Sequence, residues 1–108
     1  MSFGKRLLEA RKKKGMSQEE LAEQLGTKGP AIGRYERDEM KPSIEAAARM
    51  ADILNVSLDY LVGKTDLALD NTMMKRIQLV SKLPAKEKEC VYLLLDSFID
   101  RMKLKGVL

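Results

Sequence analysis

Apolar residues recur every three or four positions along most of the chain, and this spacing predicts helices. Segments in which apolar and polar residues alternate, as they do in a half-buried strand, do not occur in the sequence. Glycines and prolines, among them Gly15, Gly26, Pro42, Gly63 and Pro84, separate the helical segments. We therefore expect an all-α fold.

Five helices are expected before residue 64. They cover residues 3–14, residues 18–25, a third segment that ends before the polar loop 37–41, residues 43–54, and a short stretch between Ser57 and Gly63. The spacing in the fourth helix predicts a buried apolar side made of Ile44, Ala47, Met50, Ala51 and Leu54. Together these helices provide enough apolar surface for one small core.

Capping signals mark the beginning of the second and third helices. Ser17 and Glu20 match a capping box, in which each side chain bonds the backbone N–H of the other residue. We expect Thr27 to cap the third helix, because Gly29 and Pro30 follow it and proline is tolerated in a first turn. Two short helices joined by a tight glycine turn form a geometry that reaches a DNA major groove.

The pattern of residues after position 63 predicts a second helical region. Residues 64–71 are typical of a linker, and two further helices are expected on either side of Pro84, over about 73–83 and 84–104. The seventh helix carries a broad apolar stripe, which consists of Val91, Leu94, Leu95, Phe98 and Met102. Such a stripe is too apolar to stand alone in water. We expect a two-helix hairpin whose stripe pairs with a second chain, or else packs within its own chain.

The composition excludes several kinds of active site. The sequence has 108 residues, no histidine and a single cysteine, Cys90. A histidine-based triad, a histidine metal ligand, an internal disulfide and a cysteine zinc cluster are therefore impossible, and we expect neither metal nor cofactor. The unpaired thiol suits a reducing compartment, and the longest apolar run is far shorter than the roughly 20 residues of a membrane span. The N-terminus lacks the apolar stretch of a signal peptide, so we expect a cytoplasmic protein.

Positive charge is concentrated at the two ends of the chain. Residues 1–16 hold six bases and one acid, residues 17–66 six bases and ten acids, and residues 67–108 eight bases and five acids. A polyanion would be attracted to the first segment. The bases from Arg11 to Lys14 also suit a solvated helix end, where they complement the helix macrodipole. Charge alone leaves both interpretations open.

A succession of short segments in residues 3–61 carries a family resemblance. In order they are Phe3-Gly4-Lys5-Arg6-Leu7, Gly15-Met16-Ser17-Gln18-Glu19-Glu20-Leu21-Ala22-Glu23-Gln24-Leu25-Gly26, Ile32-Gly33-Arg34-Tyr35-Glu36-Arg37, Lys41-Pro42-Ser43-Ile44 and Leu54-Asn55-Val56-Ser57-Leu58-Asp59-Tyr60-Leu61. On these residues the chain resembles the phage-repressor helix-turn-helix family of transcriptional regulators, of Cro/cI or XRE type. The resemblance implies a five-helix, lambda-repressor-like DNA-binding domain at 3–63, with the helix-turn-helix motif at about 18–37. The linker 64–71 and a C-terminal helical dimerisation segment at 72–108 would follow it.

The resemblance also implies a set of DNA-contacting residues, namely Gln18, Thr27, Lys28, Gly29, Pro30, Arg34 and Arg37. Gln18 occupies the family's phosphate-contacting position, and is otherwise an ordinary exposed helix residue. Arg34 falls on a position that faces base edges, where a guanidinium can bond O6 and N7 of guanine; contact with a phosphate or with solvent is the alternative. Gly29 and Pro30 depart from the polar side chains usual at these positions. Either the backbone approaches closely there, or readout depends on Lys28, Arg34 and DNA shape.

Charged residues around the third helix complete the comparison with the family. Arg11 and Glu36 match a pair that forms an ion pair between the first helix and the end of the third, which implies a structural role for Arg11. Asp38 and Glu39 depart from the pattern, because this loop commonly holds glycine and a base near phosphate. Two acids there would repel the DNA backbone unless they turn away, whereas Arg37 could still reach it.

We therefore predict a sequence-specific DNA-binding transcriptional regulator that contacts the major groove of double-stranded DNA. The expected form is a repressor that binds a palindromic operator, an inverted repeat, as a homodimer. The alternative is an antitoxin-like interaction module, which binds a partner protein through its C-terminal helices and autoregulates its own operon. An enzyme is not expected, because the acids fall at caps, in loops and on exposed faces. We expect no membrane partner.

Overall fold

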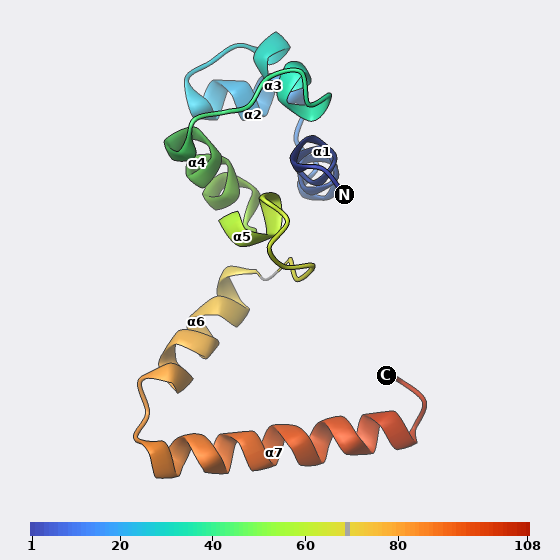
Figure 1. Ribbon diagram of the computed structural model, residues 1–108, viewed down its shortest axis with the longest axis vertical. Helices are drawn as coiled ribbons and strands as arrows, with labels where there is room; N and C mark the ends of the chain where they lie inside the picture. The colour runs from blue at the N-terminus through green and yellow to red at the C-terminus, as the bar shows by residue number, and fades with distance from the viewer. Residues whose placement is uncertain (69) are drawn as a thin grey trace. The chain divides into compact units, whose positions relative to one another are not determined.

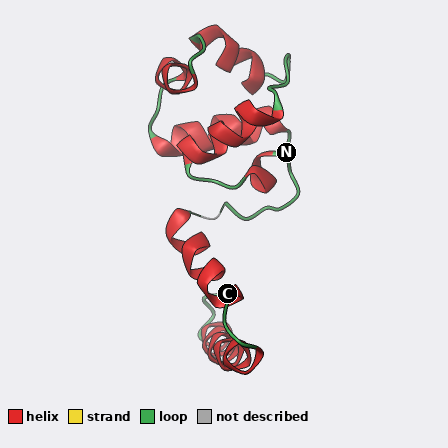
Figure 2. Cartoon of the chain, turned by 90° about the vertical axis from the view of Figure 1, so that its left-hand side faces the viewer, coloured by secondary structure: helices red, strands yellow, loops and turns green. Residues whose placement is uncertain are grey.

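The computed structural model describes residues 1–68 and 70–108, and within these residues the regular secondary structure is entirely helical, as the apolar spacing predicts (Figure 2). The helices of this described part are α1 (Phe3–Lys14), α2 (Gln18–Leu25), α3 (Gly29–Glu36), α4 (Ile44–Leu54), α5 (Leu58–Leu61), α6 (Asn71–Ser81) and α7 (Ala85–Leu104) (Figure 1). The chain divides into two compact units, Met1–Asn71 and Thr72–Leu108.

Each of the first five helices contributes one side chain that is fully shielded from solvent. These side chains are Leu7 of α1, Leu21 of α2, Ile32 of α3, Met50 of α4 and Leu61 of α5. Helix α3 contacts α1 and α2, while α4 contacts α1, α2 and α5 (Figure 1). Burial of one such side chain contributes about 1.5–3 kcal/mol. The shared core therefore stabilises five helices that are too short to be stable in isolation.

Serine side chains cap α1, α2, α4 and α5, and the predicted capping box is confirmed. The hydroxyl of Ser17 accepts the Glu20 N–H at 3.0 Å, and the Glu20 carboxylate accepts the Ser17 N–H at 3.1 Å. The hydroxyls of Ser43 and Ser57 accept backbone N–H groups in the same way at the start of α4 and α5. These bonds satisfy first-turn donors that have no partner within the helix.

The prediction that Thr27 caps α3 is wrong. The N-cap residue is Lys28, which makes no side-chain capping hydrogen bond, and the Thr27 N–H instead bonds the Ala22 carbonyl at 2.9 Å to close the end of α2. A capping side chain normally bonds the second or third N–H of the helix. Here the second belongs to Pro30, which has none, and the third, of Ala31, donates to the Lys28 carbonyl at 3.0 Å.

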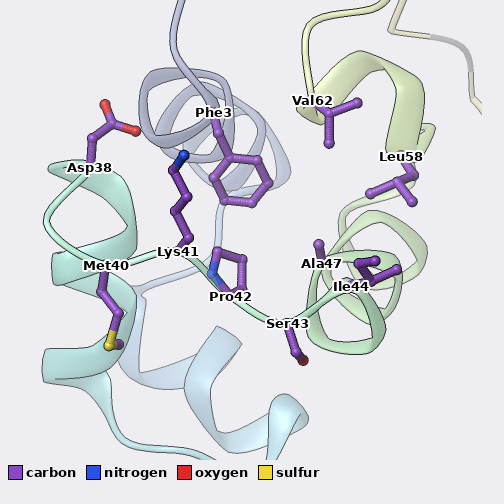
Figure 3. A pocket seen from close by; sticks show the side chains of 10 residues that line it. All are labelled: Phe3, Asp38, Met40, Lys41, Pro42, Ser43, Ile44, Ala47, Leu58 and Val62. Atoms are coloured by element: carbon purple, nitrogen blue, oxygen red, sulfur yellow. The ribbon is translucent and has the colours of Figure 1, made fainter.

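Helix α4 buries all but one of its predicted core residues. Ala47, Met50, Ala51 and Leu54 are buried as expected, whereas Ile44 is 78% exposed. Helical side chains tilt toward the N-terminus, so a side chain in the first turn projects past the neighbours that cover the following turns. Ile44 instead lines an open apolar pocket of about 300 Å³, together with Phe3, Pro42, Leu58 and Val62 among others (Figure 3).

A buried arginine in α1 holds the start of the predicted linker. Arg6 is only 6% exposed, and its Nη1 donates to the carbonyls of Tyr60 at 2.9 Å and Thr65 at 2.6 Å. Its Nη2 donates to the Asp66 carboxylate at 2.8 Å, and the guanidinium lies 4.7 Å from the centroid of the Tyr60 ring. Residues 64–66 are therefore fixed to the amino-terminal unit. The sequence pattern gives no sign of this contact, because most of the partners are distant backbone carbonyls.

The carboxy-terminal unit exposes most of its apolar side chains. Its helices α6 and α7 are completely described, and neither contains a buried residue. Of the predicted stripe on α7, Leu94, Phe98 and Leu95 are 72%, 60% and 52% exposed, whereas Val91 and Met102 are partly buried. The predicted hairpin packing stays a prediction.

The boundaries of this unit follow the breakers in the sequence. Helix α7 begins directly after Pro84 and ends at Leu104, as predicted. Helix α6 begins at Asn71, within the predicted linker 64–71, of which Leu69 lies outside the described residues. No helix in the described part of the chain is long and apolar enough to cross a membrane.

Candidate nucleic-acid interface

Helix α3 is buried on one side and exposed on the other. Ile32 is fully buried and Glu36 is 9% exposed, whereas Lys28, Pro30 and Arg34 are exposed. Pro30 and Arg34 are four residues apart, so they lie on the same face of the helix. The structure thus presents a basic, proline-containing helix face at the surface of the amino-terminal unit.

Gly29 brings the beginning of α3 close to α2. A Cβ at this position would lie 3.2 Å from Cγ of Glu19, which is closer than an ordinary van der Waals contact. Gly29 is itself partly buried, while Thr27, in the turn between the two helices, is exposed. A side chain at position 29 would therefore require the exposed Glu19 side chain to move by a few tenths of an ångström.

The Arg11 and Glu36 side chains connect α1 to the last turn of α3. Nε of Arg11 lies 2.6 Å from Oε2 of Glu36, and Nη2 lies 3.1 Å from Oε1. The side chains are only 10% and 4% exposed, and Nη1 of Arg11 also donates to the Met16 carbonyl at 2.9 Å. This bidentate geometry fixes the position of α3 relative to α1.

Gln18, the first residue of α2, is attached to the same carboxylate. Its Nε2 donates to Oε1 of Glu36 at 2.9 Å, and the residue is partly buried. Glu36 therefore accepts hydrogen bonds from both α1 and α2, and it orients the Gln18 amide at the start of the helix. The sequence pattern does not indicate this contact, because no short-range spacing relates two residues that lie on different helices.

Arg37 lies beside Gly33 on α3. A Cβ at Gly33 would be 3.0 Å from Nη1 of Arg37 and 3.6 Å from Oε1 of Gln18, so the missing side chain leaves room for both groups. The Arg37 guanidinium also pairs with Glu39, through Nε to Oε2 and through Nη2 to Oε1 at 3.4 Å. The hydrogen bond from Arg37 lowers the pKa of the Glu39 carboxyl. The family resemblance does not indicate this pairing, because an acid at position 39 departs from the family pattern.

Asp38 points toward α1. Its φ is 59°, in the left-handed region, and its carboxylate accepts the Gly4 N–H at 2.9 Å. Hydrogen bonds from the Ser2 hydroxyl and the Gly4 N–H lower the pKa of Asp38. Gly4 is required for this close approach, because a Cβ there would lie 2.5 Å from two carbonyl oxygens at the end of α3. The beginning of α1 is thus fastened to the segment that follows α3.

Within residues 1–68 and 70–108, no group of three or more histidine, cysteine, aspartate and glutamate side chains is placed to hold a metal ion. The open pocket at Ile44 is lined mainly by apolar side chains, with Asp38 and Lys41 among its other lining residues (Figure 3). Around Glu36, by contrast, a buried carboxylate accepts three hydrogen bonds, two from Arg11 and one from Gln18.

Comparisons with known proteins place this arrangement in context. A family model described as helix-turn-helix (HTH_3) matches residues 7–61. The HTH-type transcriptional regulator ImmR of Bacillus subtilis (strain 168) is 42% identical over 71 residues, which are 66% of this chain and 56% of ImmR. The cryptic phage CTXphi transcriptional repressor RstR of Vibrio cholerae serotype O1 is 27% identical over 108 residues, which are 100% of this chain and 96% of RstR.

The solved structures of similar fold include a repressor bound to an operator. The P22 c2 repressor protein in complex with a synthetic operator matches with a TM-score of 0.57 and 31% sequence identity, over 60% of this chain and 98% of the repressor chain. The alignment with ImmR spans only 56% of that regulator. The residues matched by the family model, 7–61, include Arg11, Gln18, Arg34, Glu36 and Arg37.

Proposed function

Because the chain belongs to the helix-turn-helix family of DNA-binding transcription regulators, we propose that it represses transcription by occupying an operator with α3 in the major groove. The observation that carries this proposal is the surface position of Lys28, Pro30 and Arg34 on a helix whose opposite side, at Ile32, is fully buried. A helix held in this way can enter a groove without exposing the core. RstR and the P22 c2 protein, both named as repressors, support the direction of regulation.

Base reading and phosphate binding are divided among different residues in this proposal. Arg34 reads a guanine through O6 and N7, and Lys28 contacts the DNA from the beginning of α3. Gln18 binds a phosphate through its backbone N–H and its side chain at the start of α2. Because Glu36 already orients the Gln18 amide, less side-chain entropy is lost on binding. Contacts from Thr27, Gly29, Pro30 and Arg37 complete the proposed surface.

The carboxy-terminal helices form a homodimer in this proposal. Leu94, Leu95 and Phe98 expose a contiguous apolar surface on α7, and such a surface usually marks an interaction site. A two-fold dimer sets two copies of α3 about 34 Å apart, which matches half-sites one turn apart on an inverted repeat. The alignment with RstR over the whole chain supports a shared role for this segment.

Replacing Arg34 or Lys28 with alanine is expected to reduce the preference for the operator over an unrelated duplex. Each lost base contact reduces discrimination by about 1–3 kcal/mol. Gln18→Ala is expected to weaken binding to all sequences about equally, because a phosphate contact carries no sequence information. Fluorescence anisotropy titrations with operator and scrambled duplexes, at one fixed salt concentration, measure both effects.

Lys13→Ala serves as the matched control, since it removes one positive charge from the exposed end of α1. This variant should keep the discrimination of the wild type. The thermal unfolding midpoints of the Lys28→Ala, Arg34→Ala and Lys13→Ala variants should stay close to that of the wild type, because these three residues are exposed. An operator preference that survives both Arg34→Ala and Lys28→Ala would show that these residues do not read bases.

A further inference from the structure

We propose that Glu39 sets the DNA affinity of this protein by holding the Arg37 guanidinium, so that a DNA phosphate competes with the Glu39 carboxylate for the arginine. This inference rests on the proposed function, because it assumes that DNA binds the surface formed by α2 and α3. The inference assigns a role to Glu39, whose negative charge would otherwise only repel bound DNA.

The contact between the two side chains is specific in its geometry. Glu39 accepts from two nitrogens of Arg37, Nε and Nη2, so the guanidinium is held by an edge rather than by a single atom. The Glu39 N–H also donates to the Arg34 carbonyl at 2.9 Å, which anchors the backbone of Glu39 to the last turn of α3. The carboxylate is therefore kept close to the helix that faces DNA in the proposed complex.

Arg37 occupies a position from which a phosphate could be bound. Its Nη1 and the Gln18 amide both lie close to Gly33, 3.0 Å and 3.6 Å from where a Cβ of that residue would be. Gln18 is the proposed phosphate contact at the beginning of α2. A guanidinium next to that amide can bind the same phosphate or its neighbour once it is free of Glu39.

The charges around Glu39 support the same conclusion. The hydrogen bond and the charge of Arg37 lower the pKa of Glu39, and the positive charge of Arg34 lowers it further. The carboxylate is thus close enough to feel both arginines of the proposed interface. The neighbouring acid, Asp38, instead bonds the Gly4 N–H at the start of α1.

The ion pair between Arg37 and Glu39 is weak enough for a DNA phosphate to compete with it. The side chains of Arg37 and Glu39 are 59% and 53% exposed, and exposed ion pairs are weak. A phosphate can therefore replace the carboxylate, but the released Glu39 then leaves a negative charge beside the DNA. The exchange therefore gives little net gain in binding free energy, and few additional counterions are released from the DNA.

Removal of the Glu39 charge is expected to strengthen DNA binding through Arg37. With Glu39→Gln in the full-length protein, operator affinity at low salt should rise by about 3- to 10-fold, and the slope of log K against log salt should become steeper by about 0.9, the value for one additional phosphate contact. In the Arg37→Ala background, Glu39→Gln should raise affinity far less than it does in the wild type, because only the direct repulsion between Glu39 and DNA is relieved there. Asp52→Asn, which removes one negative charge from the exposed side of α4, is the matched control and should leave affinity and slope unchanged.

Two results would overturn the assigned role of Glu39. One is a Glu39→Gln variant with the affinity and salt slope of the wild type. The other is an equal gain from Glu39→Gln in the Arg37→Ala background, which would mean that Glu39 repels DNA directly. Failure of the proposed function is a separate result, because then the wild-type protein itself would bind no duplex at low salt.

Discussion

Replacing Glu36 with alanine is expected to destabilise the amino-terminal unit by about 3–5 kcal/mol, which is the usual effect of removing one partner from a buried ion pair. The substitution leaves the Arg11 guanidinium, whose side chain is only 10% exposed, without its counterion. It also removes the acceptor of the Gln18 amide. Because a small domain is stable by only about 5–15 kcal/mol, this loss is a large part of the total. Urea denaturation followed by circular dichroism measures it.

The matched double substitution separates the charge from the packing. Arg11→Met with Glu36→Leu removes both charges and keeps most of the volume, so stability should return to within about 1–2 kcal/mol of the wild type. The recovered protein should still bind all DNA sequences more weakly, because Gln18 has lost the carboxylate that orients it. A Glu36→Ala variant as stable as the wild type would contradict the role of Glu36 as the connection between α1, α2 and α3.

Disruption of the apolar surface of α7 is expected to give a monomer that binds an inverted repeat far more weakly. Leu94 and Phe98 lie one helical turn apart, and both are more than half exposed. Glutamates at these two positions would place charge in the proposed dimer interface. Loss of the connection between two DNA-binding units should reduce affinity for the complete operator by about 10²–10⁴-fold. Sedimentation equilibrium and anisotropy titrations measure the two effects.

The controls for this prediction keep the α2 and α3 surface unchanged. Leu67→Glu introduces one of the same negative charges at an exposed leucine outside α7, and this variant should remain dimeric. Binding to a single half-site should be the same for the Leu94→Glu/Phe98→Glu variant and the wild type. The proposed dimer would be wrong if the wild type sedimented as a monomer, or if the double variant remained a dimer with full operator affinity.

Local rules predict most of the helices in this chain. Apolar spacing and capping residues give the limits of α1, α2 and α4 closely, because these signals depend on neighbours three or four residues away. The two errors also have local causes. Pro30 and Ala31 leave no N–H for a cap on α3, and Ile44 lies in a first turn that the core does not cover.

The polar contacts of the interface are less predictable. The pairing of Arg11 with Glu36 was expected only through the family resemblance, since the two residues lie on different helices. The contacts of Gln18 with Glu36 and of Arg6 with residues 60–66 depend on how the helices pack, which no sequence spacing describes. Arg37 and Glu39 are close in sequence, but their pairing depends on the turn that follows α3.

Selection of bound duplexes from a random pool tests most directly whether α3 reads DNA sequence. The wild-type protein should enrich an inverted repeat whose half-site centres are about 10–10.5 base pairs apart. The Arg34→Ala variant should lose the preference at one base pair in each half-site while it keeps the spacing. A pool that shows no enriched sequence with the wild type at low ionic strength would contradict the account.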